Sequence, residues 1–313
     1  MTRLRGFDKR ISGPKSFVVC VAIVVTVLVS LVTAAAQAPR FRIRTDVVTV
    51  TVTVTDSVGR IITGLTQDDF EVFEDGIQEQ ITQFTDDRVP VSLGVLLDSS
   101  DSMRGEGMSD ARNALDRFVG QLLDGDDEAF VATFNHIPRS VTPWRKPPST
   151  LINALAATKP NGATAIYDAL AAFAPQFERR SNVRAAMVVI SDGADTASDR
   201  TLQQAREILR RSDAFVYAIA IAAPDARAST QINPDALREI TGPSGGYTEV
   251  VRTAADLGPA TARIADELNK QYVFAYSSSR SPDNTWRNIR VHVTKGDYLA
   301  RSRRAYFAEK PSS

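Results

Sequence analysis

The chain has 313 residues, of which 43% are apolar and 24% charged, and its 37 basic side chains balance its 37 acidic ones. This composition is that of globular domains, about two at ~150 residues each, and it excludes a nucleic-acid binder that works through a broad basic surface. One cysteine and two histidines exclude an internal disulfide, an iron–sulfur cluster and any metal site built from several thiolates or imidazoles, so metal ligands have to be oxygen atoms.

The N-terminal segment is first basic and then apolar. Residues 1–15 hold five basic residues and one acid, and an apolar run follows from Phe17 to Ala36. The run ends in small residues that suit signal cleavage, so we expect residues 1–36 to be an export signal peptide. The rest of the chain is then periplasmic or secreted. The alternative is an uncleaved membrane anchor formed by residues 17–36, with the body of the protein facing outside.

Residues 40–89 predict a small β-rich segment. Within residues 45–56, valine and threonine alternate strictly from Val48 to Thr55, which is the pattern of a half-buried strand. Asp75-Gly76 is a two-residue hairpin signal between expected strands at 70–74 and 77–84. So few strands make a thin core, and we expect this segment to need more of the chain to be stable.

From Pro90 onward, strands alternate with amphipathic helices. This alternation predicts an α/β fold, a doubly wound and mostly parallel sheet covered by helices on both faces, over residues 90–270. The expected strands are 91–97, 128–134, 185–190, 214–221 and 247–251, and the expected helices are 108–123, 150–158, 165–177, 201–211, 234–240 and 257–269.

Strand patterns return after the last helix, at 271–277, 286–293 and 300–307. Residues 271–309 are too few to fold alone. We therefore expect residues 271–309 to pair with 40–89 in one β-rich unit, with the α/β domain of residues 90–270 inserted between them. The alternative is two independent β extensions that pack on the α/β domain.

Polar side chains follow two of the expected strands directly. Strand 91–97 runs into the segment 98–102 (Asp-Ser-Ser-Asp-Ser), and strand 185–190 runs into 191–195 (Ser-Asp-Gly-Ala-Asp). A third polar segment, 161–164 (Asn-Gly-Ala-Thr), lies just before an expected helix. The carboxyl ends of parallel strands share one edge of a sheet, so these oxygen atoms are expected to gather there. Such hard donors suit Mg²⁺, Mn²⁺ or Ca²⁺ rather than zinc or copper.

These residues resemble a known family. Asp98-x-Ser100-x-Ser102, followed by Thr164 and then by Asp192 in Ser-Asp-Gly-x-Asp, is similar to the metal-ion-dependent adhesion site of von Willebrand factor type A domains. The resemblance covers about residues 88–270 and implies their Rossmann-like fold. The flanking segments, residues 63–76 among them, resemble bacterial exported proteins that carry such a domain.

The resemblance implies a role for each matched position. Ser100, Ser102 and Thr164 would coordinate the ion directly or through water, and Asp98 and Asp192 would do so directly or through an intervening ligand.

Two further carboxylates stand beside this motif. Asp101 occupies a position where the family often has glycine, and its extra carboxylate would either bind the ion more tightly or weaken its pull on an acidic ligand. Asp195 would support Asp192 or its loop rather than bind the ion.

The function expected from this resemblance is an extracytoplasmic binding module, not an enzyme. Its divalent cation would bridge to an Asp or Glu of a partner protein, and membrane contact would come only through an uncleaved N-terminal segment. Two alternatives stay open, namely a structural protein whose metal site is vacant and a metal-assisted hydrolase. The hydrolase is disfavoured because the sequence has no Gly-x-Ser-x-Gly elbow and no histidine base near any of these motifs.

Two charged clusters are interpreted as solvated. They are the turn 124–127 (Asp-Gly-Asp-Asp) and the arginines Arg301, Arg303 and Arg304.

Overall fold

The computed structural model describes residues 47–145, 152–192, 194–221, 233–253 and 256–310. The expected export segment, residues 1–36, lies outside them. Within the described ranges, no helix combines the length and the apolar character needed to cross a bilayer.

A six-stranded sheet forms the centre of the α/β part, in the order β10-β9-β8-β5-β6-β7. Neighbouring strands from β10 to β6 are parallel, and β7 is antiparallel to β6. The doubly wound, mostly parallel sheet expected from the sequence is therefore present. Its strands are β5 (Val91–Asp98), β6 (Glu128–Phe134), β7 (Arg139–Arg145), β8 (Arg184–Ser191), β9 (Phe215–Ile221) and β10 (Thr248–Val251).

The edge strand β7 is missing from the expected elements. Only Thr142 among its residues is buried, and Pro143 lies within it. Proline is tolerated only where the backbone N–H is not needed for a ladder, as on an edge strand, and a mostly exposed strand lacks apolar alternation. With a proline in the segment and no apolar alternation, the sequence does not predict a strand here.

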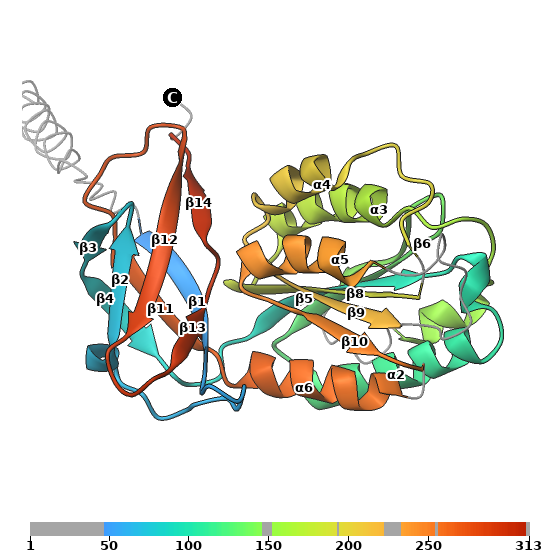
Figure 1. The fold of residues 1–313 in the computed structure, drawn as a ribbon, viewed down its shortest axis with the longest axis horizontal. Helices are drawn as coiled ribbons and strands as arrows, with labels where there is room; N and C mark the ends of the chain where they lie inside the picture. The colour runs from blue at the N-terminus through green and yellow to red at the C-terminus, as the bar shows by residue number, and fades with distance from the viewer. Residues whose placement is uncertain (1–46, 146–151, 193, 222–232, 254–255, 311–313) are drawn as a thin grey trace, which may run out of the picture. The chain divides into compact units, whose positions relative to one another are not determined.

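Helices cover both faces of this sheet (Figure 1). On one face α2 and α6 pack on the strands, and on the other face α3, α4 and α5 do so. Among the described residues, the α-helices are α2 (Glu106–Leu122), α3 (Ile166–Phe173), α4 (Leu202–Leu209), α5 (Pro234–Thr241) and α6 (Leu257–Asn269).

Short 3-10 helices replace parts of two expected α-helices. The expected helix 150–158 is a 3-10 helix over Ile152–Ala157, and the expected helix 165–177 ends as α3 at Phe173. A 3-10 helix follows from Ala174, with Pro175 in its first turn. Proline has no N–H and cannot continue the hydrogen bonds of an α-helix, which is why α3 ends here. The other 3-10 helices are Gln67–Asp69, Asp101–Met103 and Gly242–Ser244.

Strands from the two ends of the described chain share two four-stranded sheets, ordered β13-β1-β11-β4 and β14-β12-β2-β3. In the first, β1 is antiparallel to β11, with Val47 opposite Ser277. In the second, β2 is antiparallel to β12, with Glu74 opposite Ile289. The strands are β1 (Val47–Thr55), β2 (Phe70–Glu74), β3 (Ile77–Glu79), β4 (Ile81–Thr85), β11 (Tyr272–Ser277), β12 (Thr285–Val293), β13 (Leu299–Arg301) and β14 (Ala305–Ala308).

Two expected strands are each divided between these sheets. The expected strand 77–84 is β3, which pairs with β2, followed by β4, which pairs with β11. The expected strand 300–307 is β13 followed by β14. Each break lets the chain cross from one sheet to the other.

The hairpin expected at Asp75-Gly76 joins β2 to β3. Asp75 has φ 48° and Gly76 has φ 87°. A two-residue turn with both φ angles positive matches the twist of the strands, which is why Asp-Gly predicts it.

The charged clusters interpreted as solvated are solvated only in part. Asp127 is fully buried and accepts hydrogen bonds from the backbone N–H groups of Val91 (2.7 Å) and Asp124 (2.7 Å). Arg301 forms an ion pair with Glu267 on α6, and Arg303 forms one with Asp213. For Asp127, Arg301 and Arg303 the interpretation as solvated was therefore wrong, because sequence alone does not show which charges another element will cover. Asp124, Asp126 and Arg304 are exposed, as expected.

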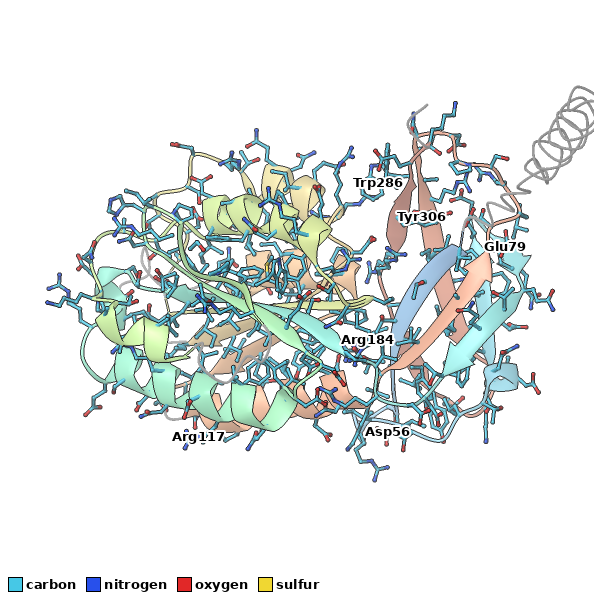
Figure 2. The ribbon with its side chains drawn as sticks, turned by 180° about the vertical axis from the view of Figure 1, so that it is seen from behind. Asp56, Glu79, Arg117, Arg184, Trp286 and Tyr306 are labelled. Carbon is cyan, nitrogen blue, oxygen red and sulfur yellow. The ribbon has the colours of Figure 1, made fainter. Side chains whose placement is uncertain are left out.

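Glu267 near the end of α6 is buried and accepts hydrogen bonds from two elements. The hydroxyl of Tyr217 on β9 donates over 2.8 Å, and that of Thr53 on β1 donates over 3.1 Å. Beside it, Arg184 of β8 donates to Gln271 over 2.7 Å, and Figure 2 labels Arg184 at this junction. The last turn of α6 is thus tied both to the α/β sheet and to the β strands.

Candidate metal centre

Asp98 ends a strand whose residues are all buried, and it is itself fully buried. Its Oδ1 accepts a hydrogen bond from the backbone N–H of Ser100 (2.8 Å), and its Oδ2 accepts one from the hydroxyl of Ser191 (2.5 Å). Ser191 ends the neighbouring strand β8, so the two strand ends are joined through this carboxylate. Both lie at the carboxyl edge of the parallel sheet, which Figure 1 shows on the side away from the β strands of the chain ends.

Ser100, Ser102 and Asp192 form a short hydrogen-bonded chain of oxygen atoms. The Oγ atoms of the two serines are 3.0 Å apart, and Oγ of Ser102 donates to Oδ1 of Asp192 over 2.7 Å. Either serine hydroxyl can be the donor in the contact between them. Four of the five expected ligands, Asp98 among them, therefore lie within one network at the ends of β5 and β8.

Backbone hydrogen bonds attach the loop that carries Thr164 to this network. The N–H of Asn161 donates to the carbonyl of Ser99 (2.8 Å), and the N–H of Asp101 donates to the carbonyl of Gly162 (2.9 Å). The carbonyl of Thr164 accepts from the N–H groups of residues 196 (2.9 Å) and 197 (3.0 Å), beyond Asp192. Thr164 is buried between the two other loops. Its side chain does not join the serine–aspartate chain.

Gly162 allows this loop to pass close to the end of β6. Its φ is 78°, in the left-handed region that favours glycine, and a Cβ at this position would lie 2.5 Å from Nδ1 of His136. His136 thus packs against the loop that carries Thr164. Any side chain at position 162 would push the loop away from His136.

Burial sets the protonation of the two aspartates. Burial raises the pKa of Asp98 to about 6, against hydrogen bonds from Ser191 and Ser100 that lower it, and the nearby charge of Asp192 adds to the rise. Burial also raises the pKa of Asp192, and its hydrogen bond from Ser102 offsets part of this effect. In the part of the chain that the structure describes, neither aspartate forms an ion pair with a basic side chain. A cation at this position would supply the missing countercharge.

The two accessory carboxylates expected near the site point elsewhere. Asp101 is 58% exposed and forms an ion pair with Arg104 (2.6 Å). Asp195 accepts hydrogen bonds from the N–H of Tyr167 in the first turn of α3 (3.0 Å) and from the hydroxyl of Ser198 (2.6 Å). Asp195 therefore holds the start of the helix that follows Thr164.

Two residues of this site were not among the expected ones. Ser191 binds the carboxylate of Asp98, and the amide of Asn135 donates to the carbonyl (2.8 Å) and the side-chain oxygen (2.9 Å) of Asn161. Both had a visible signal in the sequence, because each is a polar residue at the end of a buried strand. Their roles depend on which loops meet, and that is not visible in the sequence.

The spacing of three of these oxygen atoms is compatible with a small hard cation. Octahedral Mg²⁺ binds oxygen at about 2.1 Å, so neighbouring ligands lie ~3.0 Å apart. The separations of 3.0 Å between Ser100 and Ser102 and 2.7 Å between Ser102 and Asp192 are close to that value. The described residues contain no group of three or more His, Cys, Asp or Glu side chains placed to hold a metal. A cation here would depend on hydroxyl ligands as much as on carboxylates.

The family model of the von Willebrand factor type A domain matches residues 93–266. No curated protein matches the sequence.

Solved structures share the fold at low sequence identity. A von Willebrand factor type A protein from Catenulispora acidiphila is similar with a TM-score of 0.52 and 13% identity, over 76% of this chain and 72% of that one. Proximal thread matrix protein 1 of the mussel byssus, in a structure with a zinc-occupied MIDAS motif, is similar with a TM-score of 0.51 and 15% identity, over 62% of this chain and 49% of that one. At these identities the likeness shows the fold alone.

Proposed function

Because the chain belongs to the von Willebrand factor type A domain family, we propose that it is an exported binding module whose divalent cation captures an acidic side chain of a partner protein. The cation is Mg²⁺, with Mn²⁺ or Ca²⁺ as the alternatives. Its proposed ligands are Asp98, Ser100, Ser102, Thr164 and Asp192.

The observation that carries this proposal is the pair of carboxylates at two strand ends, linked by serine hydroxyls at metal-ligand spacing. Asp98 and Asp192 need a countercharge, and the spacing around Ser102 suits an octahedral ion. The zinc found in the motif of the mussel protein supports a divalent cation in this fold.

The ligand set favours binding over catalysis. Hydroxyl ligands are neutral and leave more positive charge on the ion than carboxylates would, so a free coordination position attracts a carboxylate from outside. Domains of this family mediate protein–protein interactions. The basic and then apolar start of the chain supports a location outside the cytoplasm.

Calorimetry tests the metal site directly. We expect the full-length protein to bind Mg²⁺, Mn²⁺ or Ca²⁺ at one site, and Asp98→Ala or Asp192→Ala to abolish the binding heat, since each removes a proposed ligand. Asp199→Ala is the matched control, because this exposed aspartate lies on the loop that follows Asp192. If none of the three ions binds, the proposal is wrong and the domain has a structural role.

Affinity capture tests the partner. The immobilised protein, incubated with an extracytoplasmic extract in Mg²⁺, should retain a protein that EDTA elutes. The Asp98→Ala variant should retain none of it, and the Asp199→Ala variant should retain it fully. Undiminished capture by Asp98→Ala would contradict a metal-bridged contact.

A further inference from the structure

An arginine-lined cavity of about 250 Å³ lies between the α/β part and the β strands, and none of its lining residues belongs to the candidate metal centre. Its walls come from α4 and its end, from α5 and the 3-10 helix after it, and from the segment 302–305 where the chain crosses from β13 to β14. Four arginines line it, namely Arg206, Arg210, Arg303 and Arg304.

The charge of this lining is strongly positive. Asp213 is the only acid among the lining residues, and it forms an ion pair with Arg303. Arg206 and Arg210 have partners outside the lining, Glu239 at 3.1 Å and Glu207 at 3.4 Å, in pairs whose side chains are 38% to 57% exposed. Exposed pairs of this kind contribute little and exchange easily. They leave both arginines available to an anion.

The guanidinium of Arg304 takes no part in the contacts between the α/β part and the β strands. Its guanidinium has no hydrogen bond or ion pair with any residue that the structure describes. Arg303 by contrast does connect the two parts, since it also donates to the carbonyl of Thr49 (2.8 Å). Even so, Nε of Arg303 is buried and has no acceptor. Arg304 is thus the lining arginine whose guanidinium no described residue engages.

An aromatic side chain holds Arg210 in place. The guanidinium carbon of Arg210 lies 4.0 Å from the ring centroid of Trp286, which Figure 2 labels on β12. Stacking of this kind leaves the guanidinium edge free to form two parallel hydrogen bonds with a carboxylate or phosphate. Apolar side chains complete the wall, among them Leu209, Ile240 and Pro243.

We propose that this cavity binds a small organic anion that carries a phosphate or carboxylate group. The charged group lies against the arginines, Arg304 above all, and the carbon part lies against the apolar wall. A cavity of about 250 Å³ is too small for a macromolecule and smaller than the usual pocket for a drug-sized ligand, so the ligand is a small molecule.

Titration with three probes tests this proposal. Inorganic phosphate, phenyl phosphate and benzoate are titrated into the full-length protein by calorimetry, in buffer freed of metal ions so that the candidate metal centre does not contribute. We expect saturable binding, with phenyl phosphate tighter than inorganic phosphate because of the apolar wall. Benzoate distinguishes a carboxylate ligand from a phosphate ligand, and binding of either aromatic anion supports the proposal.

Variants locate the binding. Arg304→Ala and Arg206→Ala should each weaken it by ~10-fold, the usual effect of losing one charge-assisted hydrogen bond. Arg238→Ala is the matched control, because Arg238 forms a similar exposed pair with Asp235 on α5 outside the lining. Quenching of Trp286 fluorescence, absent in Trp286→Phe, should follow the same binding curve.

Three results would overturn the proposal. They are no saturable binding of any probe, binding that Arg304→Ala and Arg206→Ala leave unchanged, and equal weakening by Arg238→Ala. The guanidinium of Arg304 has no hydrogen-bond or ion-pair partner among the described residues, so its variant is expected to keep the fold, and thermal unfolding of each variant checks this.

Discussion

Glu74 is a buried carboxylate that connects the two β sheets. It accepts hydrogen bonds from Arg287 (2.9 Å), Ser278 (2.7 Å), Tyr306 (2.8 Å) and Tyr276 (2.9 Å). Tyr276 lies on β11 in one sheet, whereas Arg287 and Tyr306 lie on strands of the other. Only 1% of the side chain of each member of the Glu74–Arg287 pair is exposed, so each needs the other.

Glu74→Gln is expected to lower the free energy of unfolding by about 3 kcal/mol at neutral pH, because it leaves the buried Arg287 charge with only the partly exposed Asp283, at 3.4 Å, as a counterion. Urea unfolding measures this change. Asp235→Asn is the control, since Asp235 is 87% exposed in its pair with Arg238 and should cost under ~1 kcal/mol. Equal effects of the two substitutions would show that the buried Glu74–Arg287 pair contributes no more to stability than the exposed Asp235–Arg238 pair.

The contribution of Glu74 also has a definite pH dependence. Burial raises the pKa of Glu74, but hydrogen bonds from Ser278, Tyr306, Tyr276 and Arg287 lower it by more, so the net pKa lies below the ordinary 4.5. A carboxyl whose pKa is lower in the folded state stabilises the fold above its unfolded pKa and loses that effect as the pH falls through the folded value. The difference in stability between wild type and Glu74→Gln should therefore shrink below pH ~4.5. A difference that stays constant down to acid unfolding would contradict this assignment.

At the scale of elements, α3 receives its N-terminal cap from a distant loop. Its own N-cap residue, Ala165, has no side chain that caps the helix. Asp195 supplies this function by accepting the N–H of Tyr167, and the hydroxyl of Ser198 accepts the N–H of Asp168 over 3.1 Å. Because Thr164 directly precedes this helix, the cap also holds the proposed metal ligand in place.

Asp195→Ala is therefore expected to lower the free energy of unfolding by ~1 kcal/mol, as the loss of a helix cap does. It should weaken Mg²⁺ binding only a few-fold, because Asp195 positions the loop and does not touch the ion in our proposal. Calorimetry beside Asp192→Ala and Asp199→Ala separates these roles. Complete loss of Mg²⁺ binding in Asp195→Ala would instead identify Asp195 as a ligand.

At the scale of the whole molecule, the apolar cores do not mix. Two clusters of buried residues, one on each face of the six-stranded sheet, come only from Val91 to Leu268. A third cluster comes only from Val48 to Ile81 and from Tyr272 to Val293. Contacts between the two parts are largely polar, as at Glu267. We propose on this basis that residues 90–270 are a domain inserted into a β-rich domain made of residues 40–89 and 271–309.

Expression of residues 90–270 alone tests the inserted-domain proposal. We expect a fragment that unfolds cooperatively and binds Mg²⁺ within about threefold of the full-length affinity, since the site lies far from the cut ends. The fragment should be less stable than the whole protein, because Arg184 loses the carbonyl of Val89 and the side chain of Gln271. Aggregation without a cooperative transition would contradict the proposal.

The sequence by itself determined the class of the fold and the chemistry of the candidate site. Nearly continuous apolar runs predicted the parallel strands of the central sheet, because a strand buried on both faces has apolar side chains on both. The scarcity of cysteine and histidine left oxygen donors as metal ligands, and the polar residues after two of these strands predicted where they would gather.

Only the tertiary structure decided the features that depend on which segments meet. The division of residues 77–84 between two sheets, the helix cap by Asp195 and the burial of Asp127 all involve contacts across many residues of sequence. The arginine-lined cavity is likewise formed by α4 together with the segment between β13 and β14, about 100 residues later in the chain. Hydrophobic patterns indicate which face of a helix or strand is buried. They do not indicate which residue a charged side chain will contact. The candidate metal centre could be predicted because its residues directly follow predicted strands, whereas the cavity depends on elements whose contact no sequence pattern indicates.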